Sequence, residues 1–182
     1  MKLTSQTLAA VALAVASGTA LAQLPNLPAD TSNTCVGSVD SVRQGRHTST
    51  ETADGIFWPP NHKLRTVTIY AENDDGDECD VTITAVQQDE PVDGLGDGST
   101  TPDAANCNNS GNASKVDLRG ERSGMGTGRY YTIAYTMKDP DYPVEDKMGT
   151  ATLLVPHDQG VAHLGTYVNE GPAFDSGAGC AP

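Results

Sequence analysis

The stretch Leu64-Arg65-Thr66-Val67-Thr68-Ile69-Tyr70-Ala71 decides the fold class, because its apolar residues recur at every second position. Val67, Ile69 and Ala71 therefore share one face of an extended chain, which is the pattern of a half-buried β-strand. The alternation is repeated in the segments 81–86, 115–121, 129–138 and 150–155. No segment after position 22 carries a convincing helical period, so we expect an all-β protein.

The segments between these stretches are rich in Gly, Asp, Asn, Ser and Pro, the residues that form turns. Short strands separated by such turns are typical of a β-sandwich or a small barrel. We expect this domain to occupy residues 36–159, beginning with a weak strand at 36–42. The Gly-rich insert at 93–114 is long for a loop, and we expect its part 105–113 to be loosely ordered. Residues 160–182 are expected to form a tail with one further strand at Ala162–Val168.

The first 22 residues have the features of a signal peptide. Lys2 gives a basic start, residues 8–16 are apolar, and Ala20-Leu21-Ala22 forms a cleavage site before Gln23. The apolar run is too short to span a bilayer, so no membrane insertion is expected. Residues 23–35 are polar with two prolines and are expected to form a flexible leader. The sequence therefore predicts a secreted, periplasmic or cell-surface protein.

The formal net charge of −13 argues against nucleic acid and anionic membranes as partners. Both require clustered Lys and Arg. The charge is compatible with cation binding, but simple solubility is the first explanation for it.

Four cysteines in an exported chain favour two disulfides, for which three pairings are possible. Cys35 and Cys180 flank the domain, so we predict that they pair and join its ends. Cys79 would then pair with Cys107. The short C-x-x-C spacing of redox and zinc sites does not occur, which favours structural bridges.

Five polar or proline-containing motifs lie at the ends of the expected strands. They are Phe57–Lys63, Asp89–Val92, Gly96–Gly98, Glu121–Gly124 and Pro156–Gln159. If the strands follow immunoglobulin order, all five motifs meet at one pole of an antiparallel β-sandwich. Loops on a rigid scaffold are where functional residues gather, so we expect the site there. Its predicted members are Trp58, Asn61, His62, Lys63, Asp89, Glu90, Asp97, Glu121, Arg122, Arg129, His157 and Asp158.

The order of these motifs also resembles a known module. The strings FWPPNHK, DEPV, GDG, LRGERSG, G-x-GR-x-YTI and VPHDQ, spread over roughly residues 56–159, resemble a bacterial secreted Ig-like module. Such modules are often associated with hyalin-repeat-like domains. The resemblance implies an immunoglobulin-like sandwich on an exported protein, and it implies no particular activity.

Three kinds of chemistry are open at this pole. Calcium takes about six to eight oxygen ligands on loops, and the candidate ligands are Asp89, Glu90, Asp97, Asp103, Glu121 and Asp158. His62 and His157 with a carboxylate would suit a transition metal and hence a metal-dependent hydrolase. Ser123 as a nucleophile would need a histidine base within hydrogen-bond reach.

The same residues also fit a purely structural role. Arg122 and Arg129 would pair with Asp89, Glu90 or Asp158 in a buried network that fixes loop geometry. Trp58 would close one end of the core. We interpret the chain as a non-enzymatic module for extracellular binding, adhesion or structural assembly, with calcium as an optional cofactor. Its partners would be a cell surface, a matrix or further copies of itself, and a secreted metal-dependent hydrolase is the alternative.

Overall fold

The structure, a computed structural model, describes residues 35–41, 54–141, 146–158 and 168–180. Across these ranges the chain is all-β, with nine strands and no helix, so the prediction of an all-β protein is confirmed. The described part contains no helix of the length and apolarity that crossing a membrane requires. The predicted signal peptide, leader residues 23–34 and most of the strand candidate Ala162–Val168 lie outside the described residues.

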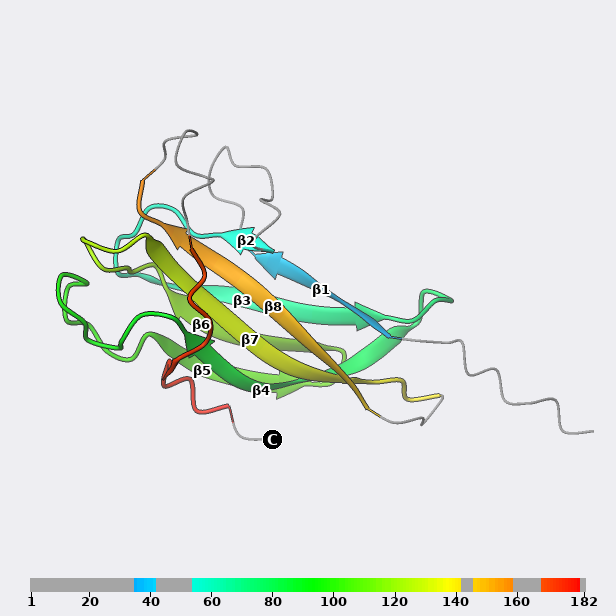
Figure 1. The fold of residues 1–182 in the computed structure, drawn as a ribbon. Coiled ribbons are helices and arrows are strands. Elements are labelled where there is room, and N and C mark those ends of the chain that lie inside the picture. Colours follow the sequence, from blue (N-terminus) through cyan, green and yellow to red (C-terminus); the bar gives the residue numbers. More distant parts are fainter. Residues whose placement is uncertain (1–34, 42–53, 142–145, 159–167, 181–182) are drawn as a thin grey trace, which may run out of the picture. The chain divides into compact units, whose positions relative to one another are not determined.

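The strands form two sets (Figure 1). In the first, β1 (Val36–Ser41), β3 (Leu64–Glu72), β6 (Ala113–Arg119) and β5 (Ala104–Ser110) are antiparallel neighbours in that order. In the second, β2 (Gly55–Ile56), β8 (Lys147–Pro156), β7 (Gly128–Lys138) and β4 (Glu78–Gln88) follow one another. The short β9 (Phe174–Asp175) pairs with the end of β4. The β2–β8 pair is parallel, and β3 and β4 join the two sets at the pairs Ala71↔Cys79 and Glu72↔Glu78.

The apolar faces expected from the alternation form one core between the two sets. Val67, Ile69 and Ala71 of β3 are at most 1% exposed, and they belong to the same buried cluster as inward-facing residues of β4, β6, β7 and β8. Burying such side chains is the main favourable term in folding. Phe57, rather than Trp58, closes this core: Phe57 is fully buried and Trp58 is only half-buried. The prediction for Trp58 was wrong because the inward alternation runs through Gly55 and Phe57.

Residues 105–113, expected to be loosely ordered, instead complete a hairpin. Ser110 and Ala113 pair across the two-residue turn Gly111-Asn112, where Gly111 has φ +60°. A Gly-Asn turn between two extended segments is a hairpin signal that the sequence does contain. The Asn109 side chain then reaches β4, accepting from Ile83 N at 2.8 Å and donating to Ile83 O at 3.1 Å. The side-chain amide of Asn109 thus satisfies the backbone N–H and C=O of Ile83, as a neighbouring strand would do at this edge of β4.

The predicted disulfide pairing was wrong. The bridges are Cys35–Cys79 and Cys107–Cys180, with Cα–Cα distances of 6.2 and 5.2 Å. Cys35 directly precedes β1, which pairs with β3, and Cys79 lies opposite Ala71 on the other side of β3. The first bridge therefore links β1 to β4 across β3. The Cys107–Cys180 bridge joins the C-terminal tail to β5. The tail reaches β5 because β9 first pairs with the end of β4.

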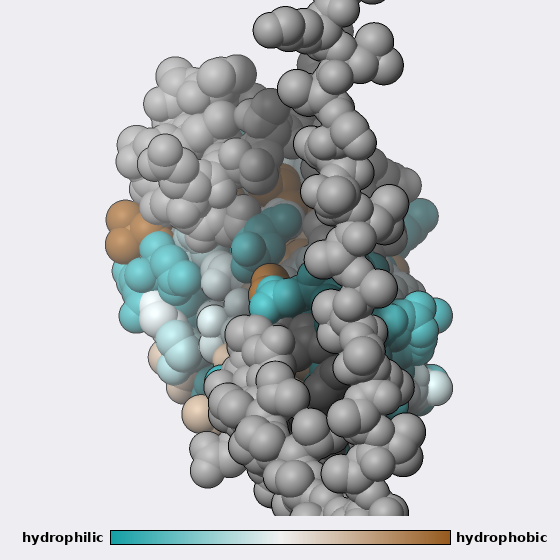
Figure 2. Space-filling model, turned by 90° about the vertical axis from the view of Figure 1, so that its right-hand side faces the viewer, coloured by the Kyte–Doolittle hydropathy of each residue, from teal (hydrophilic) through white to brown (hydrophobic). Residues whose placement is uncertain are grey.

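The strand ends define two poles. The β3–β4 turn and the segment after β7 lie at one of them, where Asn73 Nδ2 donates to Asp139 Oδ2 at 3.0 Å. Figure 2 views the molecule from this end, and hydrophilic residues predominate among the coloured atoms. The loops that carry the five motifs lie at the other end (Figure 1). We call that end the motif pole and define it as residues 57–63, 89–103, 119–130 and 156–158.

Candidate functional site

Direct contacts join motifs that are far apart in the sequence. His62 Nδ1 lies 2.9 Å from Glu121 Oε2, and Arg122 Nη2 donates to the carbonyl of His157 at 2.9 Å. The backbone N–H of Gly124 donates to Gly96 O, also at 2.9 Å. The structure thus brings together segments that precede β3, follow β4, follow β6 and follow β8.

Arg129 lies at the centre of the motif pole and is fully buried. Its Nε donates to Glu90 Oε2 at 3.1 Å, its Nη1 to Asp103 Oδ2 at 2.7 Å and its Nη2 to Asp97 Oδ2 at 3.3 Å. Glu121 Oε1 lies 3.8 Å from Nη1. One guanidinium thus faces four carboxylates from two loops, the β4–β5 loop and the β6–β7 loop. We call these five side chains the Arg129 network.

Residues that were not among the predicted site members complete the network. Gln88 is fully buried, and its Nε2 donates to Asp103 Oδ2 at 2.6 Å and to Glu90 O at 2.9 Å. Thr100 Oγ1 donates to Glu121 Oε2. The signal for Gln88 was its inward position two residues after Val86 on β4. A buried amide there requires polar partners.

The Arg129 network carries more negative than positive charge. Asp97, Asp103 and Glu121 are each at most 1% exposed. Burial raises the pKa of Asp103, against the hydrogen bond from Gln88 and the charge of Arg129, which lower it. Asp103 Oδ1 and Glu121 Oε1 are buried without a hydrogen-bond partner. Such a network specifies the loop arrangement more than it adds to stability.

Asp97 holds its own loop in shape. Its Oδ2 accepts from Gly94 N at 2.5 Å and its Oδ1 from Ser99 N at 3.0 Å, while Arg129 binds the same carboxylate. Gly98 follows with φ +99°, and a Cβ there would collide with the His62 ring. The Gly96–Gly98 motif is therefore explained by a turn and a close packing contact.

The two histidines have separate partners. His62 is bound to Glu121, whereas His157 Nε2 lies 3.2 Å from Gly124 O. Ser123 Oγ donates to Leu95 O at 3.2 Å, and Ser123 N donates to Glu90 Oε2 at 2.7 Å. The contacts of the described residues thus pair neither histidine with Ser123.

Among the described His, Cys, Asp and Glu side chains, one group of three brings its potential metal-ligand atoms within 4.8 Å of one another. It consists of Cys35, Cys79 and Asp139. That group lies away from the motif pole, and its two sulfurs form a disulfide, so they offer no thiolate ligand. At the motif pole the guanidinium of Arg129 occupies the position that a cation would take among the carboxylates.

The other predicted site residues lie at the rim of the motif pole. Asn61 Oδ1 accepts from Lys63 N at 3.3 Å, a contact within the turn before β3. Asp158 Oδ2 lies 3.6 Å from His157 Nδ1, and both side chains are about 40% exposed. Trp58 contributes its carbonyl, which accepts from Arg65 Nη1 at 2.8 Å. The turn before β3 is thus ordered by hydrogen bonds to its own backbone.

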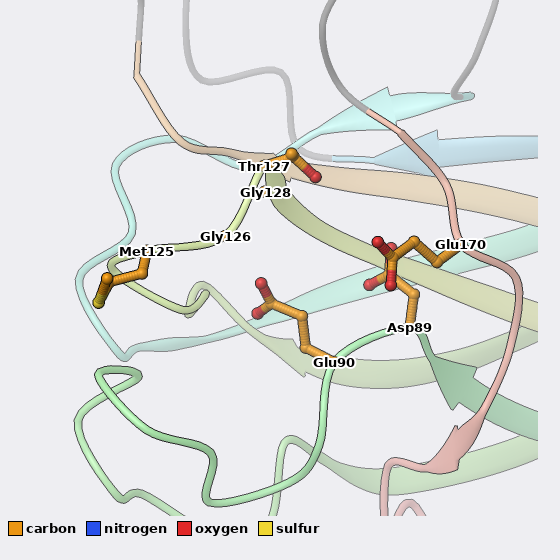
Figure 3. A pocket seen from close by; sticks show the side chains of 7 residues that line it. All are labelled: Asp89, Glu90, Met125, Gly126, Thr127, Gly128 and Glu170. Carbon is orange, nitrogen blue, oxygen red and sulfur yellow. The ribbon is translucent and has the colours of Figure 1, made fainter.

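Asp89 lies at a cavity of about 260 Å³. Asp89, Glu90, Met125, Glu170 and the backbone of residues 126–128 line it. Figure 3 shows the carboxylates of Asp89 and Glu170 lying close together, with Glu90 directed into the same space. Burial, together with the charge of Glu90, raises the pKa of Asp89 to about 6, against the N–H of Tyr130, which lowers it. That N–H donates to Asp89 Oδ1 at 2.8 Å.

The variant Asp89→Asn tests the protonation of Asp89 in this cavity through the pH dependence of stability. Because the folded protein binds the Asp89 proton more tightly than the unfolded chain, the contribution of Asp89 to the free energy of unfolding should fall as pH rises from about 4 to about 6. Asparagine keeps an oxygen for the N–H of Tyr130 and removes the charge. We therefore expect the variant to gain stability over the parent at pH 8 and to lose that advantage at pH 4. Urea unfolding at both pH values measures the difference, and an equal difference at both would contradict the assignment.

These observations describe a site that is polar, largely buried and internally bonded. Its buried part is centred on Arg129, and its open part is the acidic cavity beside Asp89. Comparison of the chain with known protein families, with curated proteins and with solved structures gives no match.

Proposed function

We propose that the chain is an exported, immunoglobulin-like β-sandwich that acts without catalysis, as an extracellular binding, adhesion or structural module. The order of strand pairing supports this fold. The set β1-β3-β6-β5 beside β4-β7-β8 matches the A-B-E-D and C-F-G order of immunoglobulin constant domains. The two disulfides are compatible with an extracellular or oxidising compartment.

The Arg129 network is the observation that carries the non-catalytic role. A catalytic carboxylate or histidine needs a free position towards substrate. Here the carboxylate of Glu121 contacts His62, Thr100 and Arg129. Asp97 and Asp103 are fully buried, and both form ion pairs with the guanidinium of Arg129. These groups therefore support a rigid set of loops, as binding domains require of their scaffold.

The proposed role predicts the metal content of the purified protein. We expect less than stoichiometric zinc or iron by elemental mass spectrometry, because His62 and His157 are engaged with different groups. A stoichiometric transition metal that His62→Ala removes would instead support the metal-dependent hydrolase. His47→Ala, which changes a histidine outside the motifs, is the matched control.

Calcium is tested separately by thermal unfolding. Because the guanidinium of Arg129 already lies among the carboxylates of its network, we expect the melting temperature in calcium and in chelator to agree within about 1 °C. A ligand that binds only the folded state at a concentration 100 times its Kd would add about 2.7 kcal/mol, which such a measurement detects readily. A clear rise in calcium that Asp158→Asn abolishes would restore calcium as a structural ligand of these loops.

A further inference from the structure

Two large apolar side chains stand almost fully exposed at the motif pole. Leu95 and Met125 are each 96% exposed, on the loops that follow β4 and β6. They are neighbours, because Ser123 Oγ donates to Leu95 O at 3.2 Å and accepts from Met125 N at 3.3 Å. Apolar side chains that are exposed together and surrounded by polar groups are typical of a protein interface.

The loops that carry this pair are held in place from below. Gly124 N donates to Gly96 O between the two tips, and Glu90 Oε2 accepts both from Ser123 N and from Arg129 Nε. On the other side Arg122 Nη2 donates to His157 O. Because these loops are already ordered, binding a partner would cost little conformational entropy, which favours affinity. Met125 adds a flexible, polarisable side chain of the kind that adapts to a partner.

The acidic cavity adjoins the pair and indicates the charge of the partner. Met125 lines it together with Asp89, Glu90 and Glu170, and none of its described lining residues is cationic. These three carboxylates do not converge within 4.8 Å, as direct ligands of one metal ion would. A cavity of about 260 Å³ is instead large enough for the end of a lysine side chain and its water. Lysine presents a compact ammonium with three hydrogen-bond donors on an apolar stem.

From this combination we propose that Leu95, Met125 and the Asp89–Glu90–Glu170 cavity form a docking surface for a polypeptide partner that presents a lysine next to an apolar side chain. The inference rests on the proposed binding function and gives it a surface and a partner chemistry. The apolar neighbour packs on Leu95 and Met125, and the ammonium enters the cavity. A second copy of the chain is a poor occupant, because the net charge of −13 makes copies repel one another.

The test is a titration of the isotope-labelled protein with the peptide Ac-Gly-Leu-Lys-Leu-Gly-NH2, followed by the backbone amide signals in nuclear magnetic resonance. We expect saturable shifts at Leu95 and at Thr127 and Gly128, and about tenfold weaker binding when norleucine replaces the lysine, because the charge-assisted contacts are lost. Glu170→Gln should weaken the lysine peptide by a similar factor and leave the norleucine peptide unchanged. Met125→Ser should weaken both peptides. Both substitutions are on exposed side chains, so folding is retained.

Equal affinity for the two peptides, or no shift at the named amides, would overturn the docking surface. Shifts confined to another surface would also overturn it, while leaving a binding role elsewhere on the domain. The proposed function itself fails by a different measurement, the stoichiometric transition metal described above. The peptide titration therefore tests the docking surface, and the metal analysis tests the proposed function.

Discussion

Arg129→Met is expected to destabilise the protein by about 3–5 kcal/mol or more, because it leaves buried carboxylates without their cation. Glu90, Asp97 and Asp103 each lie within 3.3 Å of the guanidinium, and the last two are fully buried. The loss should be largest at neutral pH and should shrink in acid, where the carboxylates take up protons. Urea unfolding at pH 4 and pH 7 measures both the size and the trend.

Arg119→Met is the matched control for that variant. Arg119 donates to the carbonyls of Pro102 and His62 and is only half-buried, so water can replace its contacts. We expect a smaller loss of stability that does not change with pH. If Arg129→Met were no worse than this control, the Arg129 network would not be the structural centre of the motif pole. A combined variant that also neutralises Asp97 and Asp103 should recover much of the lost stability.

Removing the Cys35–Cys79 bridge by a double change to Ala is expected to cost about 2–5 kcal/mol. Both cysteines are at most 6% exposed, and the bridge ties β1 to β4 across β3. Without the bridge, β1 would still pair with β3, but it would no longer be tied covalently to β4. The measurement is thermal or urea unfolding of the double variant under non-reducing conditions.

The second bridge offers the contrast. Cys180 is partly exposed, and it fastens a tail whose strand β9 pairs with β4 at two residues. Loss of Cys107 and Cys180 should therefore speed hydrogen exchange at residues 173–176 while the core amides stay protected. Equal destabilisation of the core by both double variants would contradict this division of roles.

Much of the strand arrangement could be predicted from the sequence, because alternation at β3, β4, β6, β7 and β8 is set by burial of one face. The gathering of the motifs at one pole was predicted by assuming that the strands follow immunoglobulin order. The disulfide partners could not be predicted, since they depend on Cys79 lying beside β3 and on the path of the tail after β9. Both features belong to the tertiary structure, and no local sequence pattern indicates either of them.

The central role of Arg129 in the site was harder to predict than the list of site residues. Arg129 and its carboxylate partners were predicted as site residues, but no sequence pattern distinguished them from Asn61, Lys63 and Asp158 at the rim. Only depth separates the two groups: Arg129 is fully buried, whereas Asp158 is about 40% exposed. Gln88 was missed because a polar residue at the end of a strand usually faces solvent.

The position of Arg129 in the chain bears on how the protein is made. Its four carboxylate partners, at positions 90, 97, 103 and 121, all precede it. During synthesis the acids therefore emerge from the ribosome before the side chain that neutralises them. A nascent chain that ends before β7 carries mutually repelling groups where the loops must close, so this end of the domain can only close late, after the β7 strand has been added.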